Sequence, residues 1–417
     1  MQTQLDSNLL RQNLSDATIN AADSILRNCV HCGFCLATCP TYQLLGSELD
    51  SPRGRIYQIK HLMEGATATA ITQQHLDRCL GCRNCETTCP SGVQYTKLLE
   101  SGKRLTDSSV HRSWKQQILR AMLRAIVPYR RRNALLIKIG QWLRVPLAAQ
   151  SYAELPTDYN LPPVINPTKP TIILFRGCVQ DGLAPSTNQA LKQLLIQLGF
   201  DIKQPNKEGC CGALTHHDQG IKKATPFIQQ NLEQWRPWLQ DKTSRIVVAA
   251  SGCGLMVKEY HELMQEDPNY LSLAEQASRA VADPAELLLP YLDQLKAKEG
   301  SPKRITYHPP CTQQHGLKTD GAVEQILRAV GFELLPITDR HLCCGAAGSY
   351  AIFQPKIANQ LRNNKLQQLE KREPERIVTA NIGCQHHLQQ GSEIPVVHWV
   401  ELISIEPSST PQSQPRF

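Results

Sequence analysis

The chain has 417 residues, a formal net charge of +8, a hydrophobic content of 41% and a charged content of 20%, as in a soluble protein of several domains. The first residues, MQTQLDSNLLRQNL, lack the basic and apolar segments of a secretory signal, and no apolar run approaches the roughly 18 residues that span a bilayer. Lys and Arg are spread along the chain, so no nucleic-acid partner is expected. We therefore expect a cytoplasmic protein, in which clustered cysteines stay reduced and serve as metal ligands or redox groups.

Residues 1–110 are predicted to form one domain, because they contain two copies of one cysteine spacing. CVHCGFCLATCP begins at Cys29 and CLGCRNCETTCP begins at Cys79, and both match C-x2-C-x2-C-x3-C-P. In this pattern three close thiolates bind one [4Fe–4S] cluster, and the fourth, at the start of a helix, ligates the other cluster. The predicted ligands are Cys29, Cys32, Cys35 and Cys89 for the first cluster, and Cys39, Cys79, Cys82 and Cys85 for the second. Structural zinc also takes four cysteines, but it rarely needs two such runs.

Three segments lie outside these motifs. SPRGR places Arg53 and Arg55 either beside a cluster, where they would favour its reduced state, or at a solvated turn. Residues 111–165 are predicted to be a connector, in which the basic run 128–144 forms an amphipathic helix and a Pro-rich linker follows. That helix either packs on a neighbouring domain or docks on a membrane or a partner. Residues 406–417 are predicted to be a disordered tail.

Residues 166–300 and 301–405 are predicted to be two copies of one domain. TIILFRGC, EGCCGA and ASGCG in the first copy recur as ITYHPPC, HLCCGA and NIGCQ in the second. Short β-rich runs alternate with segments of helical period, which predicts an α/β fold with a mostly parallel sheet in each copy. The predicted fold class is therefore α+β and multidomain: a helical 2[4Fe–4S] ferredoxin-like domain followed by two duplicated α/β domains.

The eight cysteines of the two copies are candidates for a further metal or cluster site. Several of them follow predicted strands, where parallel sheets bind ligands. They could bind a metal or a cluster, act as a dithiol redox centre, or pack as small apolar residues. The candidates are Cys178, Cys210, Cys211, Cys253, Cys311, Cys343, Cys344 and Cys384. Nearby histidines could ligate metal or transfer protons, or could be hydrogen-bonded loop residues: His216, His217, His308, His341, His386 and His387.

Two ferredoxin-type motifs followed by two Cys-Cys-Gly domains resemble the iron–sulfur subunits of glycolate oxidase. They also resemble those of anaerobic glycerol-3-phosphate dehydrogenase, L-lactate utilisation complexes and heterodisulfide reductase. SPRGR, EGCCGALTHH and HLCCGAAGSY are most similar to glycolate oxidase. The resemblance implies an oxidoreductase complex in which a separate flavoprotein subunit with FAD oxidises glycolate to glyoxylate. It implies that this chain, not itself catalytic on glycolate, passes electrons toward a quinone or another acceptor, with peripheral contact to the cytoplasmic face of the membrane.

Two other functions remain open from the sequence. The chain could be the iron–sulfur subunit of a lactate or glycerol-3-phosphate dehydrogenase, or the catalytic subunit of a thiol and disulfide reductase similar to heterodisulfide reductase. The domains of heterodisulfide reductase close on C-x-x-C, whereas here the stretches read CGLM from Cys253 and CQHH from Cys384. The missing thiols argue against that chemistry. A zinc-stapled binding scaffold is the third alternative.

Overall fold

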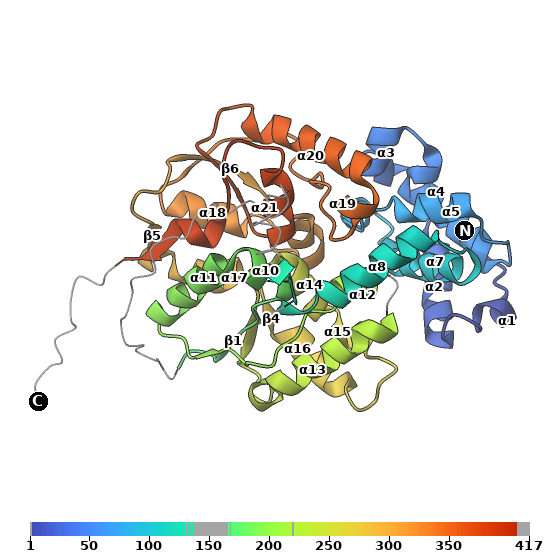
Figure 1. The fold of residues 1–417 in the computed structure, drawn as a ribbon, viewed down its shortest axis with the longest axis horizontal. Helices are drawn as coiled ribbons and strands as arrows, with labels where there is room; N and C mark the ends of the chain where they lie inside the picture. Colours follow the sequence, from blue (N-terminus) through green and yellow to red (C-terminus); the bar gives the residue numbers. More distant parts are fainter. Residues whose placement is uncertain are drawn as a thin grey trace, which may run out of the picture.

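The computed structural model describes residues 2–130, 132–133, 135–136, 166, 168–218 and 221–406. The predicted Pro-rich linker, the second half of the basic run and the predicted tail lie outside the described residues. Helices α1 to α7 lie at one end of the molecule, and the two sheet-containing copies lie at the other (Figure 1). The division of the chain at residues 110, 165 and 300 stays a prediction.

The first region is helical. Its elements are α1 (Ser7–Leu10), α2 (Asp16–Asn28), η1 (Phe34–Leu36), α3 (Pro40–Leu45), η2 (Glu48–Asp50), α4 (Pro52–Met63), α5 (Ala70–Asp77), α6 (Asn84–Thr88), α7 (Tyr95–Ser109) and α8 (Trp114–Ile126). Hydroxyl side chains cap several helix starts, as when Ser51 accepts a hydrogen bond from the Gly54 amide at 2.9 Å. Leu26, Ile59 and Leu98 are fully buried in a core between α2, α4 and α7. This core fixes the loops that carry the first eight cysteines.

The first copy contains a four-stranded sheet with the order β2-β1-β3-β4, and all its strands are parallel. Its strands are β1 (Ile172–Leu174), β2 (Ile202–Lys203), β3 (Arg245–Val247) and β4 (Val281–Ala282). Its helices are α10 (Cys178–Leu183), α11 (Pro185–Gln197), α12 (Ala213–His217), α13 (Ile221–Leu239), α14 (Ser251–Lys258), α15 (Tyr260–Leu263), α16 (Leu271–Ala280) and α17 (Pro284–Leu288), followed by η3 (Leu289–Gln294).

The second copy repeats this sheet with the order β7-β6-β8-β9, again all parallel. Its strands are β6 (Arg304–His308), β7 (Glu333–Leu334), β8 (Arg376–Thr379) and β9 (Val396–His398). Its helical elements are η4 (Thr312–Leu317), α18 (Ala322–Ala329), α19 (Tyr350–Phe353), α20 (Pro355–Glu370), α21 (Ile382–Gln389) and η5 (Trp399–Leu402). Ile305 pairs with Arg376 as Ile172 pairs with Arg245, so the two copies share one register. The predicted fold class is confirmed.

The two copies share one continuous core. Leu191 of α11, Ile326 of α18 and Trp399 of η5 belong to the same buried cluster. A two-stranded antiparallel sheet also joins them, since β5 (Leu295–Ala297) pairs with β10 (Ile403–Ile405). Over the residues that the structure describes, no helix is both long and apolar enough to cross a bilayer.

Candidate metal centre

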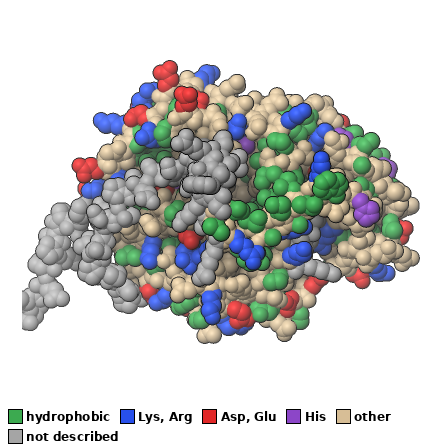
Figure 2. Space-filling view, viewed as in Figure 1, with side chains coloured by type: hydrophobic (Ala, Val, Ile, Leu, Met, Phe, Trp, Pro, Cys, Tyr) green, Lys and Arg blue, Asp and Glu red, His purple; other side chains and the backbone are tan. Residues whose placement is uncertain are grey.

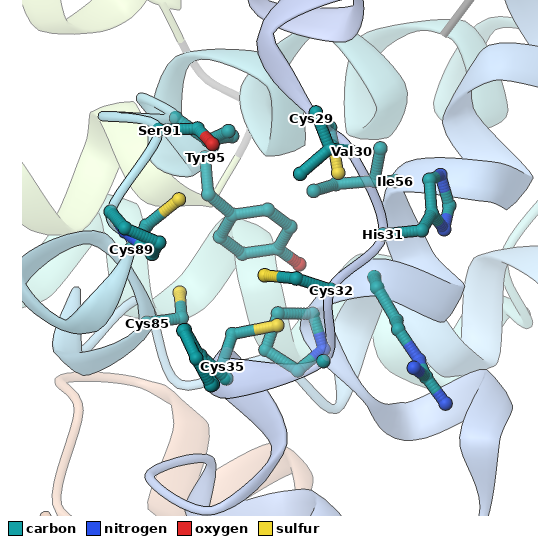
Figure 3. A pocket seen from close by; sticks show the side chains of 16 residues that line it. Cys29, Val30, His31, Cys32, Cys35, Ile56, Cys85, Cys89, Ser91 and Tyr95 are labelled. Carbon is teal, nitrogen blue, oxygen red and sulfur yellow. The ribbon is translucent and has the colours of Figure 1, made fainter.

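The first cysteine set surrounds a pocket between α2, η1 and the segment after α6. Cys29 follows the last residue of α2, Cys35 lies in η1, and Cys89 follows α6. Together with Cys32 and Cys85 they line this pocket. Figure 3 shows the five sulfur atoms around a common space beside the Tyr95 ring. Gly33 has φ +86°, and a Cβ at that position would lie 2.9 Å from the Arg53 guanidinium, which explains the glycine.

The second cysteine set surrounds an adjoining pocket. The sulfur-bearing residues that line it are Cys39, Cys79, Cys82 and Cys85. Cys85 borders both pockets, so the two sets share one wall. If Cys85 belongs to the second set, the first pocket retains four cysteines, namely Cys29, Cys32, Cys35 and Cys89. Each pocket then receives one cysteine from the other motif, and thiols are the ligands that iron–sulfur clusters use.

One local prediction was wrong. Both trailing cysteines were expected at the start of a helix. Cys39 is the residue before α3, but Cys89 comes after α6, and five residues separate it from α7, which begins at Tyr95. The hydrogen bond from the Cys89 amide to the Glu86 carbonyl ends α6 and turns the chain toward the first pocket.

The first pocket lies nearer the surface than the second. Cys32 is exposed, and Val30 and Phe34 beside it are 67% and 62% exposed. In the second set, burial raises the pKa of the Cys82 and Cys85 thiols well above the usual value. Without a metal these thiols are neutral, so metal binding must displace their protons.

The two arginines of SPRGR both line a pocket, but their environments differ. Arg53 lies at the first pocket and pairs with Glu48 at 2.6 Å near the surface. Arg55 lies at the second pocket, is 1% exposed, and donates to the His75 carbonyl at 2.8 Å and the Thr41 hydroxyl at 3.0 Å. It also pairs with the fully buried Asp50 at 3.3 Å. A permanent positive charge therefore faces the second set.

Asp50 joins three positively charged or titratable side chains at this point. His75 Nδ1 lies 3.0 Å from one carboxylate oxygen, and Arg78 lies 3.1 Å from the other. The network of Asp50, Arg55, His75 and Arg78 is thus anchored on η2, α4 and α5, and it fixes the wall of the second pocket. Asp50, His75 and Arg78 carry no recognisable sequence signal, because only the fold brings them together.

The second set contacts both α/β copies, since Arg83, between Cys82 and Cys85, pairs with Glu259 of the first copy, and two hydrogen bonds reach the second. Asn84 donates to the His341 carbonyl at 3.1 Å, and Tyr350 donates to the Arg78 carbonyl at 3.1 Å. Burial is the main cause of the raised pKa of Cys82, and repulsion from a Cys311 thiolate raises this pKa further. Repulsion from a Cys82 thiolate likewise raises the pKa of Cys343. Cys82 therefore lies within electrostatic range of Cys311 and Cys343 of the second copy.

The cysteines of the α/β copies form two similar sets. Cys178 Sγ lies 3.3 Å from Cys210 Sγ, and Cys211 contacts both Cys210 and Cys253. The second copy has the same chain of contacts, from Cys311 through Cys343 and Cys344 to Cys384. All sixteen cysteines lie in the described part of the chain, and none of them forms a disulfide bond there.

Glycine in the Cys-Cys-Gly motifs serves the same purpose in both copies. The Gly212 amide donates to Cys210 Sγ and the Gly345 amide to Cys343 Sγ, each at 3.4 Å. Gly212 has φ +90° and Gly345 has φ +91°. A Cβ at Gly345 would lie 2.6 Å from the Ala358 carbonyl oxygen, so a larger residue would displace α20.

The two sets come near each other where the copies meet. Ser251 Oγ lies 2.8 Å from Thr312 Oγ1, and the Gly252 amide donates to Asn381 Oδ1 at 3.3 Å. The amide of Asn381 also donates to Cys384 Sγ at 3.6 Å. A single site shared by all eight cysteines stays a prediction.

The histidines near these motifs differ in their surroundings. His216 Nε2 lies 3.0 Å from Glu100 Oε1, and His217 lies beside them. Lys103 and Arg104 also face this group. His387 is buried with Nε2 at 3.2 Å from the Ala358 carbonyl, and His386 contacts Gln390 at 3.0 Å.

Three other histidines lie in or beside the second copy's sheet: His308, His341 and His398. His341 contributes its backbone carbonyl to the contact with Asn84. His308 is fully buried beside Cys344 and Cys384. His398, which the sequence analysis did not single out, is also fully buried, and its Nε2 lies 3.0 Å from the Ala249 carbonyl of the first copy.

Comparisons with known proteins identify the family. Residues 25–93 match a family model described as a 4Fe-4S dicluster domain, and residues 172–258 and 305–389 match one described as a cysteine-rich domain. Over 407 residues the chain is 46% identical to the glycolate oxidase iron-sulfur subunit of Escherichia coli (strain K12), covering 97% of this chain and 98% of that one. The chain belongs to the family of glycolate oxidase iron–sulfur subunits.

Other relatives of this family extend the comparison. A probable glycolate oxidase iron-sulfur subunit of Bacillus subtilis (strain 168) is 28% identical over 418 residues, covering 91% of this chain and 93% of its own. Lactate utilization protein A of Exiguobacterium is 25% identical over 241 residues, covering 56% of this chain and 97% of its own. The family recognised from the motifs is confirmed, and so is the expectation of iron–sulfur domains.

Proposed function

We propose that the chain is the electron-transfer subunit of a flavin-dependent glycolate oxidase complex. The observation that carries the proposal is the pair of adjoining cysteine-lined pockets, which share Cys85, with the second joined to an α/β copy by the Asn84 hydrogen bond to the His341 carbonyl. The 46% identity to a glycolate oxidase iron-sulfur subunit supports glycolate as the substrate of the complex. Neither alternative, a disulfide reductase or a lactate or glycerol-3-phosphate dehydrogenase subunit, is favoured.

The pocket linings support a crossed assignment of ligands. Cys29, Cys32, Cys35 and Cys89 would hold one [4Fe–4S] cluster, and Cys39, Cys79, Cys82 and Cys85 the other. When bound, each cluster takes up and releases one electron at a time, which connects a two-electron flavin to a distant acceptor. The chain itself supplies thiolates, an apolar surround and the charge of Arg55.

The gradient of exposure supports a direction through the chain. The first pocket, with exposed Cys32, Val30 and Phe34, offers the point where a redox partner can approach closely. The second pocket is deeper, and Cys82 lies within electrostatic range of Cys311 and Cys343. We infer a route in which the partner meets the first set, and the cysteines of the second copy follow the second set as a further metal or cluster site.

The partner is proposed to be a flavoprotein subunit that carries FAD and performs the oxidation of glycolate to glyoxylate. In this view the chain is a component of an oxidoreductase complex and is not catalytic on its own. Figure 2 shows hydrophobic side chains gathered over α8, where Trp114 and Met122 are 67% and 52% exposed. Such a surface suits a subunit or a membrane contact near a quinone, and both contacts stay predictions.

One experiment tests the proposal directly. The chain is purified anaerobically, alone and with the flavoprotein that co-purifies with it, and glycolate is added while the clusters are followed by EPR. We expect glycolate to reduce the clusters only when the flavoprotein is present, and L-lactate or glycerol-3-phosphate to act far more slowly. Glycolate oxidation by the isolated chain, or clusters that stay oxidised in the complex, would contradict the proposal.

A further inference from the structure

His308 is a buried histidine whose ring nitrogens make no hydrogen bond within the described residues. It ends β6 and is 0% exposed. Neither Nδ1 nor Nε2 has a hydrogen-bond partner among the described residues. A buried imidazole without a hydrogen bond costs free energy, on the order of 1–3 kcal/mol, unless something else occupies its lone pair or its N–H. By contrast, the buried His387 and His398 each lie within hydrogen-bond distance of a carbonyl oxygen.

The groups nearest to this ring are metal ligands by type. A ring nitrogen of His308 and the sulfur atoms of Cys344 and Cys384 all lie within 4.8 Å of one another. Ligands bonded at about 2.0–2.3 Å to one tetrahedral metal ion stand roughly 3.5–3.8 Å apart. The three groups therefore need to close by only about an ångström to share one ion. Cys344 and Cys384 are 1% and 4% exposed, so both sulfur atoms lie away from bulk solvent.

The first copy serves as an internal comparison. His308 lies three positions before Cys311, and Phe175 lies three positions before Cys178 in the same register. Phe175 is 0% exposed and packs edge-on against Trp235, with the ring centroids 5.3 Å apart. An apolar ring can therefore fill this buried position of the fold. The imidazole in the second copy is not required by packing.

The charge around the second copy's cysteines also favours thiolates. Lys365 of α20 is 3% exposed and donates to the Asp339 carbonyl at 2.7 Å. Its charge acts on Cys343, Cys344 and Cys384. A buried ammonium beside these sulfur atoms partly offsets the negative charge that two or more thiolates bring to a metal.

We propose that His308, Cys344 and Cys384 bind a transition metal in the second copy, through one imidazole nitrogen and two thiolates. Mixed sulfur and nitrogen ligation suits zinc(II) or iron, as a single ion or within a cluster. Cys343, whose sulfur contacts that of Cys344, is positioned to supply a fourth ligand. This inference deepens the proposed function, and it rests on that function only in taking Cys344 and Cys384 as ligands.

The test uses the full chain, purified anaerobically with its native metals. Zinc, iron and acid-labile sulfide are measured per chain for the wild type and for His308→Phe, which copies the residue of the first copy. We expect the variant to lose at least one metal equivalent, and Cys344→Ser to lose the same metal. Loss of zinc alone identifies a single zinc ion, whereas loss of iron with sulfide identifies a cluster.

A spectroscopic measurement on the wild type needs no variant. If the metal is iron, pulsed EPR of protein labelled with 15N-histidine should reveal one directly bound imidazole nitrogen. If the metal is zinc, X-ray absorption at the zinc edge should reveal the same nitrogen. The control His398→Gln, at a buried and hydrogen-bonded histidine, should keep both the metal and this nitrogen. If His308→Phe fails to fold, His308→Cys should retain the metal and lose the nitrogen signal.

Two results would overturn the inference. One is a metal content that is the same in His308→Phe, Cys344→Ser and the wild type. The other is a centre that disappears in Cys344→Ser but persists in His308→Phe without any bound histidine nitrogen. Because the ferredoxin-type cysteines are unchanged, their EPR signals and their reduction by the flavoprotein with glycolate report separately on the proposed function.

Discussion

Asn84 donates one hydrogen bond to the His341 carbonyl at 3.1 Å and another to the Thr38 carbonyl at 2.9 Å. The residue lies between Cys82 and Cys85, and His341 lies two positions before Cys343. A single side-chain amide, 2% exposed, thus joins both cysteine motifs of the helical region to the second copy. The separation between the second pocket and the cysteines of that copy depends on this contact.

Replacing Asn84 by Ala should loosen this contact. Two partly buried carbonyls would lose their donor, at a cost of about 1 kcal/mol of stability. We expect a lower melting temperature of the metal-loaded protein and a weaker magnetic interaction between the second cluster and a paramagnetic centre in the second copy. Asn363→Ala, at an exposed position of α20, is the matched control. An Asn84→Ala protein that melts like the wild type would refute the argument.

The crossed assignment of ligands predicts which cysteines act together. Cys39→Ser should damage the same cluster as Cys82→Ser, although Cys39 belongs to the first motif. Cys89→Ser should damage the same cluster as Cys32→Ser. EPR and Mössbauer spectra of the four variants check this pairing. If Cys39→Ser instead matched Cys32→Ser, each motif would bind its own cluster.

The two arginines of SPRGR should respond differently to replacement by Met. Arg55→Met leaves Asp50 buried with one positive partner fewer, so we expect a loss of about 3 kcal/mol. Arg53→Met removes a partly exposed pair with Glu48 and should cost less than about 1 kcal/mol. Loss of the buried charge should also make the reduction potential of the second cluster more negative. Denaturant unfolding and a redox titration check both effects, and equal stabilities of the two variants would count against the buried network.

A charge at the rim of the first pocket should slow electron transfer without unfolding the protein. Phe34→Glu places a carboxylate beside exposed Cys32, where we propose that the flavoprotein docks. We expect glycolate-driven cluster reduction in the complex to slow by about tenfold or more, a change of about 1.4 kcal/mol in the barrier. Ile71→Glu, at a 64% exposed position of α5 away from the pocket, should leave the rate unchanged. The same slowing in both variants would place the docking surface elsewhere.

Acid should lower the stability of the contact between the two copies at His398. Burial lowers the pKa of His398 from 6.5 to about 4. Between pH 4 and pH 6.5 the unfolded chain binds a proton at His398 that the folded chain excludes. The contribution of His398 to the free energy of unfolding is therefore complete above pH 6.5 and is lost as the pH falls toward 4. At pH 5 the loss amounts to about 2 kcal/mol.

Denaturant midpoints at pH 7.5 and pH 5, measured anaerobically, check this effect. His398→Gln should be less stable at pH 7.5 but should lose less stability on acidification than the wild type. Taking the difference between the two proteins removes the acid sensitivity of the clusters, which both share. An identical pH dependence in the variant would show that another group controls the loss.

Much of the fold could be predicted because periodicity and spacing are local signals. The runs around β1, β3, β6 and β8 alternate with helical segments, and this alternation predicts a mostly parallel sheet in each copy, whereas the strand orders are seen only in the structure. The position of Cys89 could not be predicted, since a hydrogen bond to Glu86 ends α6 and turns the chain before α7. Local sequence does not encode that turn.

The surroundings of the candidate sites were less accessible to sequence reasoning. Asn84, Asp50 and His398 each have a partner between 25 and 257 positions away along the chain, so no single window contains their signal. His308 was noted only as one of several histidines near the motifs. What distinguishes it is the burial of its ring and its lack of a hydrogen bond among the described residues, and both depend on tertiary packing.

The pairing of β5 with β10 has a consequence for synthesis. β5 follows the first copy, yet its partner, Ile403–Ile405, is made about a hundred residues later. β5 therefore leaves the ribosome unpaired, and it stays without its partner strand until residues 403–405 have been made. Folding of the two copies is therefore coupled during synthesis. A chain that ended between the two copies would leave β5 as an unpaired edge strand, which could aggregate.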